Sequence, residues 1–421
     1  MSNELKLHQR LISYLLIAIP FLLITGPFLS DLAVVIICIL FLFNHFIFKI
    51  KKYLKNYFFI LFLFFYLTCI LSSLFSEYPS ISVFKSIFYI RFLILTFAIV
   101  YILENDPKFI NKIFISIFIC FSILIFDGFY QFIFEENIFG FMISGNRVSS
   151  FFGDELIYGS YLSKFFPIFL ALFFLLKKKS LKLNLLFSFI LVLSIYSITI
   201  SGERSALFLI LMTLAYLMIM LKLNIKILAI FFIIILTGIY SLVTLNDSIK
   251  DRMVDFTKDQ ILTEDKIYFF SEDHTGHYLS AIDIFKNNNM LIGIGPKNYR
   301  NYCYNNDKYK SKPFICSPHP HNTYIQVLTE TGIIGFMIVS SAYLFLLFLS
   351  FKYLYFRLFK KKFIFNNIQI SLFSFYIMIL WPIVPTGNFF NNYLSIIYYI
   401  PIGFLIWSFN YFKNLNKTKY I

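Results

Sequence analysis

Charged side chains are scarce in this 421-residue chain. Asp, Glu, Lys and Arg make up 14% of it, whereas a soluble globular domain averages about 25%. Hydrophobic residues instead reach 59%, including 58 Phe and 29 Tyr, and the mean hydropathy is +0.76. This composition excludes a water-soluble enzyme, a soluble nucleic-acid binder and a disordered chain, and it indicates a polytopic membrane protein.

Several familiar sequence signals are also missing. We find no repeat of fixed period and no heptad pattern. Residues 11–29 lack a small-residue cleavage site and are followed at once by a second apolar run, so we expect no cleavable signal peptide.

The sequence does contain twelve apolar runs, each with roughly the 20 residues that a helix needs to cross a bilayer. We therefore expect an all-α polytopic membrane protein with about twelve transmembrane helices. Residues 1–245 would hold helices 1–9, residues 246–322 one large loop with the catalytic segment, and residues 323–421 helices 10–12. The runs are 11–29, 32–48, 57–75, 82–103, 110–133, 156–176, 183–200, 205–221, 225–245, 323–351, 368–385 and 394–412.

Lysine and arginine are distributed unevenly between the two sides of these runs. The connections on the side of the N-terminus hold 22 of them, and the short connections on the other side hold only Arg147 and Arg204. By the positive-inside rule, both termini lie in the cytoplasm and the large loop faces the periplasm of a bacterial inner membrane. The net charge of +15 is then mostly topogenic and faces membrane lipid, so we expect no nucleic-acid partner.

The two outer arginines need a reason to be there. A guanidinium is always charged and offers a planar fork that matches phosphate oxygens, so we expect both to bind a phosphorylated lipid head group. The alternative for Arg204 is pairing with Glu203 or snorkelling to the interface. For Arg147 the alternative is pairing with a nearby acidic side chain, namely Glu135, Glu136, Asp154 or Glu155.

A Pro- and His-rich segment, residues 317–324, leads into the tenth run. Its two prolines favour an extended chain, and Asn322 is suited to cap the following helix. His321 would then lie at the positive end of that helix, which favours the neutral imidazole that a general base needs. The alternative is a histidine that only makes structural hydrogen bonds. Gly332 and Gly335 would let another helix approach closely.

The large loop offers further candidates. His274, His277 and His319 lie in it with His321, but no zinc-binding pattern is present, so we expect no metal and no cofactor. His277 is instead a candidate substrate contact. Cys303 and Cys316, 13 residues apart in an oxidising compartment, favour a disulfide over two free thiols.

Other parts of the loop predict local structure. Residues 280–286 indicate a short helix, and Gly293, Gly295 and Pro296 indicate a turn. Within the fourth run, Lys85 and Arg91 lie near an interface or pair with Asp127, and they have no assigned role.

These residues resemble a known family. His321 and Asn322, followed after nine residues by Gly332 and Gly335, are similar to the signature of the O-antigen ligase superfamily, which also includes O-antigen polymerases. The 201–207, 145–153 and 293–296 segments resemble further shared segments. The resemblance covers roughly residues 140–340.

The resemblance implies a GT-C-like, metal-independent glycosyltransferase that uses a glycan on undecaprenyl pyrophosphate. His321 resembles the catalytic histidine, and Arg204 and Arg147 resemble the arginines at the donor pyrophosphate; Asn322 and His319 are candidate substrate contacts. The family's further arginine in the large loop has no single match here: His277 stands near its place, and Arg252 and Arg300 are alternatives.

We therefore expect an inverting O-antigen ligase whose acceptor is a lipid A–core sugar. The alternative is a polymerase whose acceptor is a second lipid-linked repeat unit. Transporters usually place coupling charges near the bilayer midplane, whereas the candidate residues here lie at the outer face. A non-catalytic scaffold for an assembly complex is a further alternative, which should keep its complex in His321→Ala.

Overall fold

The computed structural model of the chain describes residues 3–45, 51–177, 179–221, 224–261, 270–310 and 315–418. Within these ranges the structure is helical, with two isolated β-bridges and no strand, which confirms the expected all-α class. The elements are α1 (Asn3–Ile24), α2 (Pro27–His45), α3 (Lys51–Leu54), α4 (Tyr57–Leu74), α5 (Pro79–Phe88), α6 (Ile90–Asn105), α7 (Phe109–Phe134), η1 (Ser150–Phe152), α8 (Tyr158–Leu175), α9 (Leu181–Ile200), α10 (Arg204–Met220), α11 (Ile225–Leu245), α12 (Asp247–Lys250), η2 (Asp251–Asp255), α13 (Phe256–Ile261), α14 (Glu272–Lys286), α15 (Tyr299–Tyr304), α16 (Asp307–Lys310), α17 (Thr323–Phe359), α18 (Asn367–Ile379) and α19 (Asn392–Thr418).

The described helices make the chain a multi-pass membrane protein. Eight are long and apolar enough to cross a bilayer, and a ninth crossing arises if Ala229–Leu245 and Asp247–Ile261, which meet at 104°, form one span. Three further apolar helices, within α2, α10 and α18, have 10–17 residues. Every predicted apolar run thus contains a helix, although residues 46–48 of the second run lie outside the described residues. The count of twelve crossings stays a prediction.

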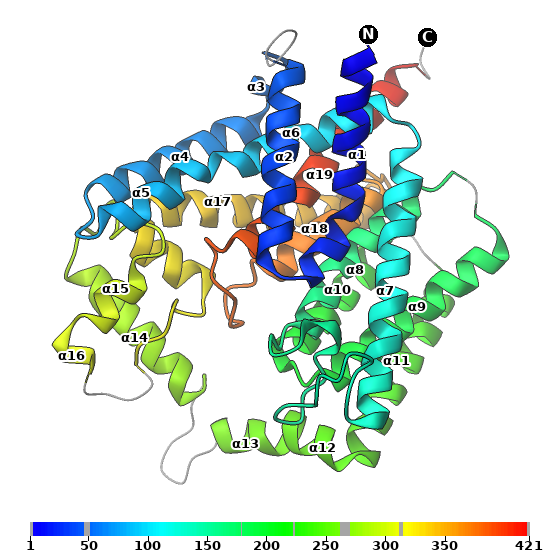
Figure 1. Cartoon of the computed structure of the whole chain (residues 1–421). Helices are drawn as coiled ribbons and strands as arrows, with labels where there is room; N and C mark the ends of the chain where they lie inside the picture. Colours follow the sequence, from blue (N-terminus) through cyan, green and yellow to red (C-terminus); the bar gives the residue numbers. More distant parts are fainter. Residues whose placement is uncertain are drawn as a thin grey trace.

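The helices are arranged so that α1 begins and α19 ends on one side of the molecule, while α12 and α13 lie on the opposite side (Figure 1). The helices α14 and α15 pack against α17. They share a small hydrophobic core of their own, separate from the main one, made of Ala281, Ile284, Ile294, Tyr299, Cys303 and Tyr309.

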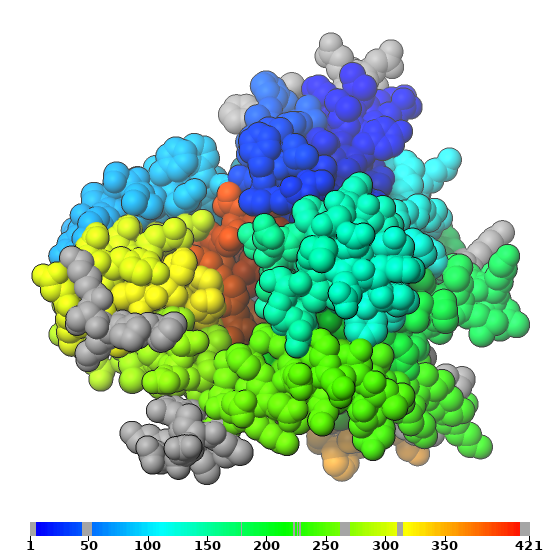
Figure 2. All heavy atoms as spheres, turned by 60° about the horizontal axis from the view of Figure 1, so that its bottom comes forward, coloured from blue at the N-terminus to red at the C-terminus, as the bar shows by residue number. Residues whose placement is uncertain are grey.

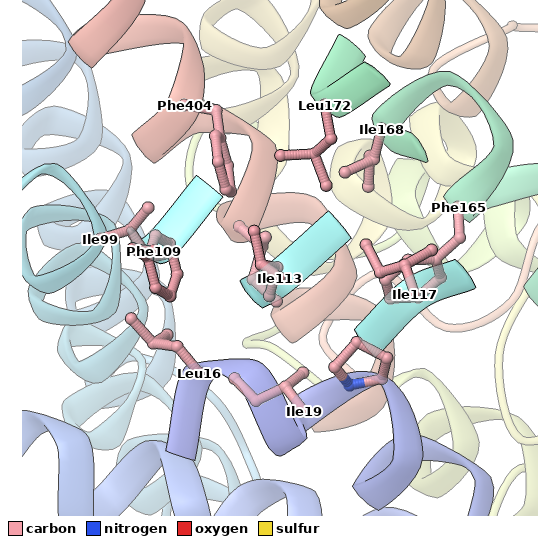
Figure 3. A pocket seen from close by; sticks show the side chains of 12 residues that line it. Leu16, Ile19, Ile99, Phe109, Ile113, Ile117, Phe165, Ile168, Leu172 and Phe404 are labelled. Atoms are coloured by element: carbon pink, nitrogen blue, oxygen red, sulfur yellow. The ribbon is translucent and has the colours of Figure 1, made fainter. Parts of the chain in front are cut away.

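The main core lies between the long helices and is rich in aromatic rings. Phe173 of α8 and Phe187 of α9, for example, stack with ring centroids 3.9 Å apart. A pocket in this core is lined by side chains of α1, α6, α7, α8 and α19 (Figure 3), all of them apolar. Because none of these side chains can transfer a proton or bind an anion, this pocket is part of the packing and not a reaction site.

Helix α17 is broken at Gly332, whose φ of 67° and ψ of −170° are not helical. The amide groups after the break donate to loop carbonyls, from Ile333 to Met290 at 2.9 Å and from Ile334 to Leu291 at 3.2 Å. A Cβ at Gly332 would lie 2.3 Å from the Leu291 backbone. The expectation of a close helix approach was therefore wrong at Gly332, whose neighbour is the turn before α15. At Gly335 a helix does approach, since a Cβ there would lie 3.7 Å from the ring of Phe65 in α4.

The loop between α7 and α8 is anchored by a buried carboxylate. Asp127 accepts hydrogen bonds from Ser150 Oγ at 2.6 Å, Asn137 Nδ2 at 3.3 Å and the Ile138 amide at 3.1 Å. It therefore does not pair with Lys85 or Arg91, which was one of the alternatives from the sequence.

Candidate functional site

His321 lies immediately before the start of α17, in a strained backbone conformation. Its φ is 56°, a left-handed value that is uncommon outside glycine. The next residue caps the helix, as expected: Asn322 Oδ1 accepts the amides of Tyr324 at 3.0 Å and Ile325 at 3.1 Å. Backbone strain of this kind persists only where the surroundings hold it in place, and it is often found at functional positions.

The chain between α18 and α19 holds the His321 segment in place. The Thr386 amide donates to the His321 carbonyl at 2.7 Å, and Asn322 Nδ2 donates to the Pro382 carbonyl at 2.7 Å. The eleventh run was expected to continue through Pro382, but α18 ends at Ile379 and the following residues form this clamp. Both the oxygen and the nitrogen of the Asn322 side-chain amide make hydrogen bonds within the protein, so the role of Asn322 as a substrate contact stays a prediction.

Four histidines from distant parts of the large loop gather at this point. The His321 ring lies 4.0 Å from His319, 5.3 Å from His277 and 5.5 Å from His274, between ring centroids. His277 and His274 come from α14, which the sequence predicted only as a short helix over residues 280–286. The cluster therefore depends on the packing of α14 against α17.

The environment of this cluster keeps the rings neutral. Burial and then the neighbouring histidines lower the pKa of His321 to about 3, and burial chiefly lowers the pKa of His319 to about 4. The pKa values of His274 and His277 are also lowered, mainly by burial. The structure thus assigns the neutral state to burial, where the sequence analysis invoked the helix end.

Two ring nitrogens of the cluster have no hydrogen-bond partner among the described residues, His277 Nδ1 and His319 Nε2. In the described part of the chain, no group of three or more His, Cys, Asp or Glu side chains is arranged to hold a metal ion. Both nitrogens are buried, so the role of His277 and His319 as substrate contacts stays a prediction.

Two arginine side chains lie against Gly202, just before the start of α10. A Cβ at Gly202 would lie 2.9 Å from Cγ of Arg147 and 3.1 Å from Cγ of Arg252. The guanidinium carbons of Arg204 and Arg252 lie 5.2 and 4.9 Å from the centre of the Phe256 ring. The positive charges of Arg147, Arg204 and Arg252 act on one another. We call these three residues the arginine cluster.

Arg204 does not pair with Glu203, which was its alternative from the sequence. Its Nη1 donates to Thr257 Oγ1 at 2.8 Å and its Nη2 to Gln260 Oε1 at 2.7 Å. Both partners belong to α13, in the large loop. Neutral partners leave the positive charge uncompensated, which is the state that an anionic ligand needs.

Arg147 is half-buried and only partly satisfied. Its Nη2 donates to the Leu156 carbonyl at 2.7 Å, and its buried Nε has no partner among the described residues. Within the described residues it forms no ion pair with the acidic residues that flank it in sequence. Burial lowers its pKa, while the charge of Glu203 opposes that shift.

Glu203 is buried among these cations but is already in use. Its Oε1 accepts the amides of Gly159 at 2.7 Å and Ser160 at 3.2 Å, at the start of α8. Burial raises the pKa of Glu203, and Arg147 and Lys164 oppose the rise. Sequence reasoning overlooked Lys164, although a lysine inside the predicted run 156–176 was a signal that it has a partner.

Burial and His277 are the main causes that lower the pKa of His274, and the positive charge of Arg204 contributes as well, so the arginine cluster lies within electrostatic range of the histidines. Of the three residues considered for the family's loop arginine, His277 lies in the histidine cluster and Arg252 lies with Arg147 and Arg204. Arg300 lies in α15 instead, and its charge acts on His319.

On the face in Figure 2, the orange-red chain near the start of α19 is seen between the yellow region of α15 to α17 and the blue-green loop after α7.

The segment that leads to His319 is braced by covalent and hydrogen bonds. Cys303 of α15 and Cys316 form a disulfide with Cα atoms 5.7 Å apart. Ser280 of α14 donates to the Ile315 carbonyl at 3.1 Å and lies 2.7 Å from the Tyr299 hydroxyl. These contacts fix the approach of the chain to the histidine cluster.

Comparison with known proteins agrees with the resemblance found in the sequence. The family model described as O-Antigen ligase matches residues 189–340, which include Arg204, Arg252 and the histidine cluster. No curated protein matches the chain. The family match supports a membrane glycosyltransferase of ligase or polymerase type.

Proposed function

We propose that this member of the O-antigen ligase superfamily is a ligase that transfers a glycan from undecaprenyl pyrophosphate to a sugar hydroxyl of lipid A–core. The reaction would take place at the periplasmic face of the bacterial inner membrane, with both termini in the cytoplasm. The observation that supports the proposal is that a neutral histidine cluster and an arginine cluster lie within electrostatic range of each other, through His274 and Arg204.

The arginine cluster would bind the donor pyrophosphate. When the bond between the anomeric carbon and the pyrophosphate oxygen breaks, the electron pair stays on that oxygen and negative charge grows there. Positioned guanidiniums stabilise such charge without reorganisation. Arg204 and Arg147 would supply this stabilisation, as a divalent metal does in other transferases, and Arg252 would complete the set.

His321 would act as the general base. Its neutral imidazole takes the proton of the acceptor hydroxyl while the acceptor oxygen forms a bond to the anomeric carbon. Attack from the face opposite the leaving pyrophosphate inverts the configuration at that carbon. The clamp by Thr386 holds His321 in place, and the free nitrogens of His277 and His319 would contact the sugars.

The test is the surface glycan of a strain that lacks this gene, compared on a gel with strains restored with the wild type or with His321→Ala. Bare core, with polymer accumulating on the carrier lipid, supports the ligase. Core that carries a single repeat unit would replace the ligase with a polymerase. Unchanged glycan in the deletion strain, with no second enzyme for the reaction, would refute both.

A further inference from the structure

The chain that follows α11 lies beside the start of α10, and the mechanism above uses only Arg252 from it. Ala229–Leu245 and Asp247–Ile261 meet at 104°, so α12, η2 and α13 turn away from α11 and lie on the side opposite the termini (Figure 1). Ile249 and Met253 pack against the main core, whereas no residue of α13 is buried. Burial therefore does not explain the position of α13, and its contacts with the arginine cluster do.

Two polar side chains of α13 bind one guanidinium at both of its terminal nitrogens. Arg204 Nη1 donates to Thr257 Oγ1 at 2.8 Å, and Arg204 Nη2 donates to Gln260 Oε1 at 2.7 Å. Thr257 and Gln260 are three residues apart, so they lie on the same face of the helix. The Thr257 hydroxyl donates its own hydrogen to the Met253 carbonyl at 2.9 Å, which leaves its oxygen as an acceptor for Arg204. The orientation of the planar guanidinium is therefore set by α13.

The ring of Phe256, at the start of α13, contacts the same guanidinium and a second one. The guanidinium carbons of Arg204 and Arg252 lie 5.2 and 4.9 Å from its centre, within the range of a cation–π interaction. Arg252 Nε also donates to the Gly202 carbonyl at 3.4 Å. The segment formed by η2 and α13 thus supplies one arginine of the cluster from its own sequence and orients another by contact.

The hydrogen-bond partners that α13 offers to Arg204 are neutral. A carboxylate in either place would form a stronger, charge-assisted hydrogen bond, but it would also neutralise the arginine. Acidic residues occur in the same segment, yet among the described residues neither Asp255 nor Asp259 forms an ion pair with Arg204. A guanidinium has further N–H donors beyond the two that α13 engages. Arg204 is thus held in a fixed orientation and keeps both charge and donors for an anionic ligand.

We propose that Thr257 and Gln260 are positioning residues of the donor site, which orient the guanidinium of Arg204 toward the pyrophosphate and leave its charge free. The inference rests on the proposed function. It assigns part of donor recognition to the large loop, because α13 acts through an arginine at the start of α10. A change in either residue should therefore alter donor binding and leave the acceptor unaffected.

The test measures binding of undecaprenyl pyrophosphate to the purified full-length protein and the KM values in the transfer assay. Thr257→Val and Gln260→Met each remove one acceptor and nearly keep the side-chain shape. Each should weaken binding about three- to tenfold, as expected for the loss of one hydrogen bond. The KM for the donor should rise by a similar factor, and the KM for the acceptor should not change. Thr257→Ser retains the hydroxyl and should restore binding, and Lys258→Gln, at an exposed position of the same helix, is the matched control.

Gln260→Glu separates the orientation of Arg204 from simple attachment of α13. A carboxylate binds a guanidinium more strongly than an amide does, so a residue that only holds α13 in place would tolerate this change or gain from it. A positioning residue would not, because the new negative charge opposes the pyrophosphate. Binding of undecaprenyl pyrophosphate should therefore fall by about tenfold or more. Unchanged binding in Gln260→Glu would overturn the inference.

A comparison in the Arg204→Ala background tests whether both residues act through Arg204. Thr257→Val and Gln260→Met should cause no further loss of binding there, since the guanidinium that they orient is gone. Losses of equal size with and without Arg204 would overturn the inference in favour of a general effect on the loop. Tighter binding in either single variant would also overturn it, because α13 would then cover the donor site.

The inference and the proposed function can fail separately. If the wild type transfers glycan and Arg204→Ala does not, while Thr257→Val and Gln260→Met change neither donor binding nor the donor KM, the positioning role is wrong and the function stands. If binding of undecaprenyl pyrophosphate depends on Arg204, Thr257 and Gln260 as predicted but the wild type transfers no glycan, the positioning role stands and the function is wrong.

Discussion

His277 and His321 stack, with ring centroids 5.3 Å apart and ring planes inclined by 26°. The contact joins α14 of the large loop to the residue that precedes the helix cap of α17. Since burial lowers the pKa of both imidazoles, the two rings can lie together without charge repulsion. His277 therefore packs directly against the ring of the proposed base.

The first prediction concerns pH. Burial and the neighbouring histidines lower the pKa of His321 to about 3, from an ordinary 6.5, so the base stays neutral and active through pH 5. The rate of transfer in proteoliposomes should therefore show no acid limb near pH 6.5. A midpoint near 6.5 that disappears in His321→Gln would contradict the account. The lowered pKa values also affect the free energy of unfolding. The stabilisation that comes from burying neutral rings is fully present above pH 6.5, and it is lost as the pH falls toward 4 and the unfolded chain takes up protons.

The second prediction concerns Arg252, which the structure places with Arg147 and Arg204. Arg252→Gln should lower kcat/KM for the lipid-linked donor by about 10- to 100-fold, because one charge-assisted hydrogen bond contributes about 1.5–3 kcal/mol. Lys258→Gln in α13 is the control, because Lys258 is exposed and its only described ion pair is with Asp255, at 3.9 Å. Equal activity of the two variants would remove Arg252 from the site.

The third prediction concerns Gly202. Its φ is 66°, and an added Cβ would lie 2.9 Å from Arg147 and 3.1 Å from Arg252, so Gly202→Ala should displace both side chains and lower donor turnover at least tenfold. The control is Gly140→Ala, where φ is 83° but no atom lies within 4 Å of the new Cβ. It imposes similar backbone strain without the collision, and it should keep its activity. Equal losses in the two variants would assign the effect to strain alone.

The fourth prediction concerns the disulfide between Cys303 and Cys316. Closing a loop of this size stabilises a fold by roughly 3 kcal/mol in the chain-entropy model. The Cys303→Ser, Cys316→Ser double variant should therefore lose protection of the large loop against proteolysis, and its transfer activity should fall. Maleimide labelling gives an independent check, because the intact protein should take up label at these two positions only after reduction. Label at both before reduction would contradict the bond.

Local features of the fold could be predicted from the sequence. Long apolar runs give helices because the backbone must satisfy its own hydrogen bonds in lipid, and the cap at Asn322 and the turn at Gly293 and Gly295 follow from residue type. The end of α18 was missed because the apolar pattern continues to Pro382, while hydrogen bonds from Asn322 and the following residues pull that chain away from the helix.

Contacts between distant residues could not be predicted. His274 and His277 reach His321 only because α14 packs against α17, and no local pattern encodes that packing. The same holds for Arg252, whose place beside Gly202 depends on how the chain turns after α11. A charged residue inside an apolar run was the one usable sequence signal for such contacts. Lys164 interacts electrostatically with Glu203, and Lys85 lines a pocket together with Pro296 of the large loop.

The most direct test of the central claim is glycan transfer by purified protein in proteoliposomes, with a lipid-linked donor and lipid A–core as acceptor. Wild type should form glycosylated core and release undecaprenyl pyrophosphate. His321→Ala should lower the rate by roughly 100- to 10,000-fold, as expected for loss of a general base, while it stays inserted and still binds the donor. Transfer by His321→Ala at the wild-type rate would show that His321 is not the base.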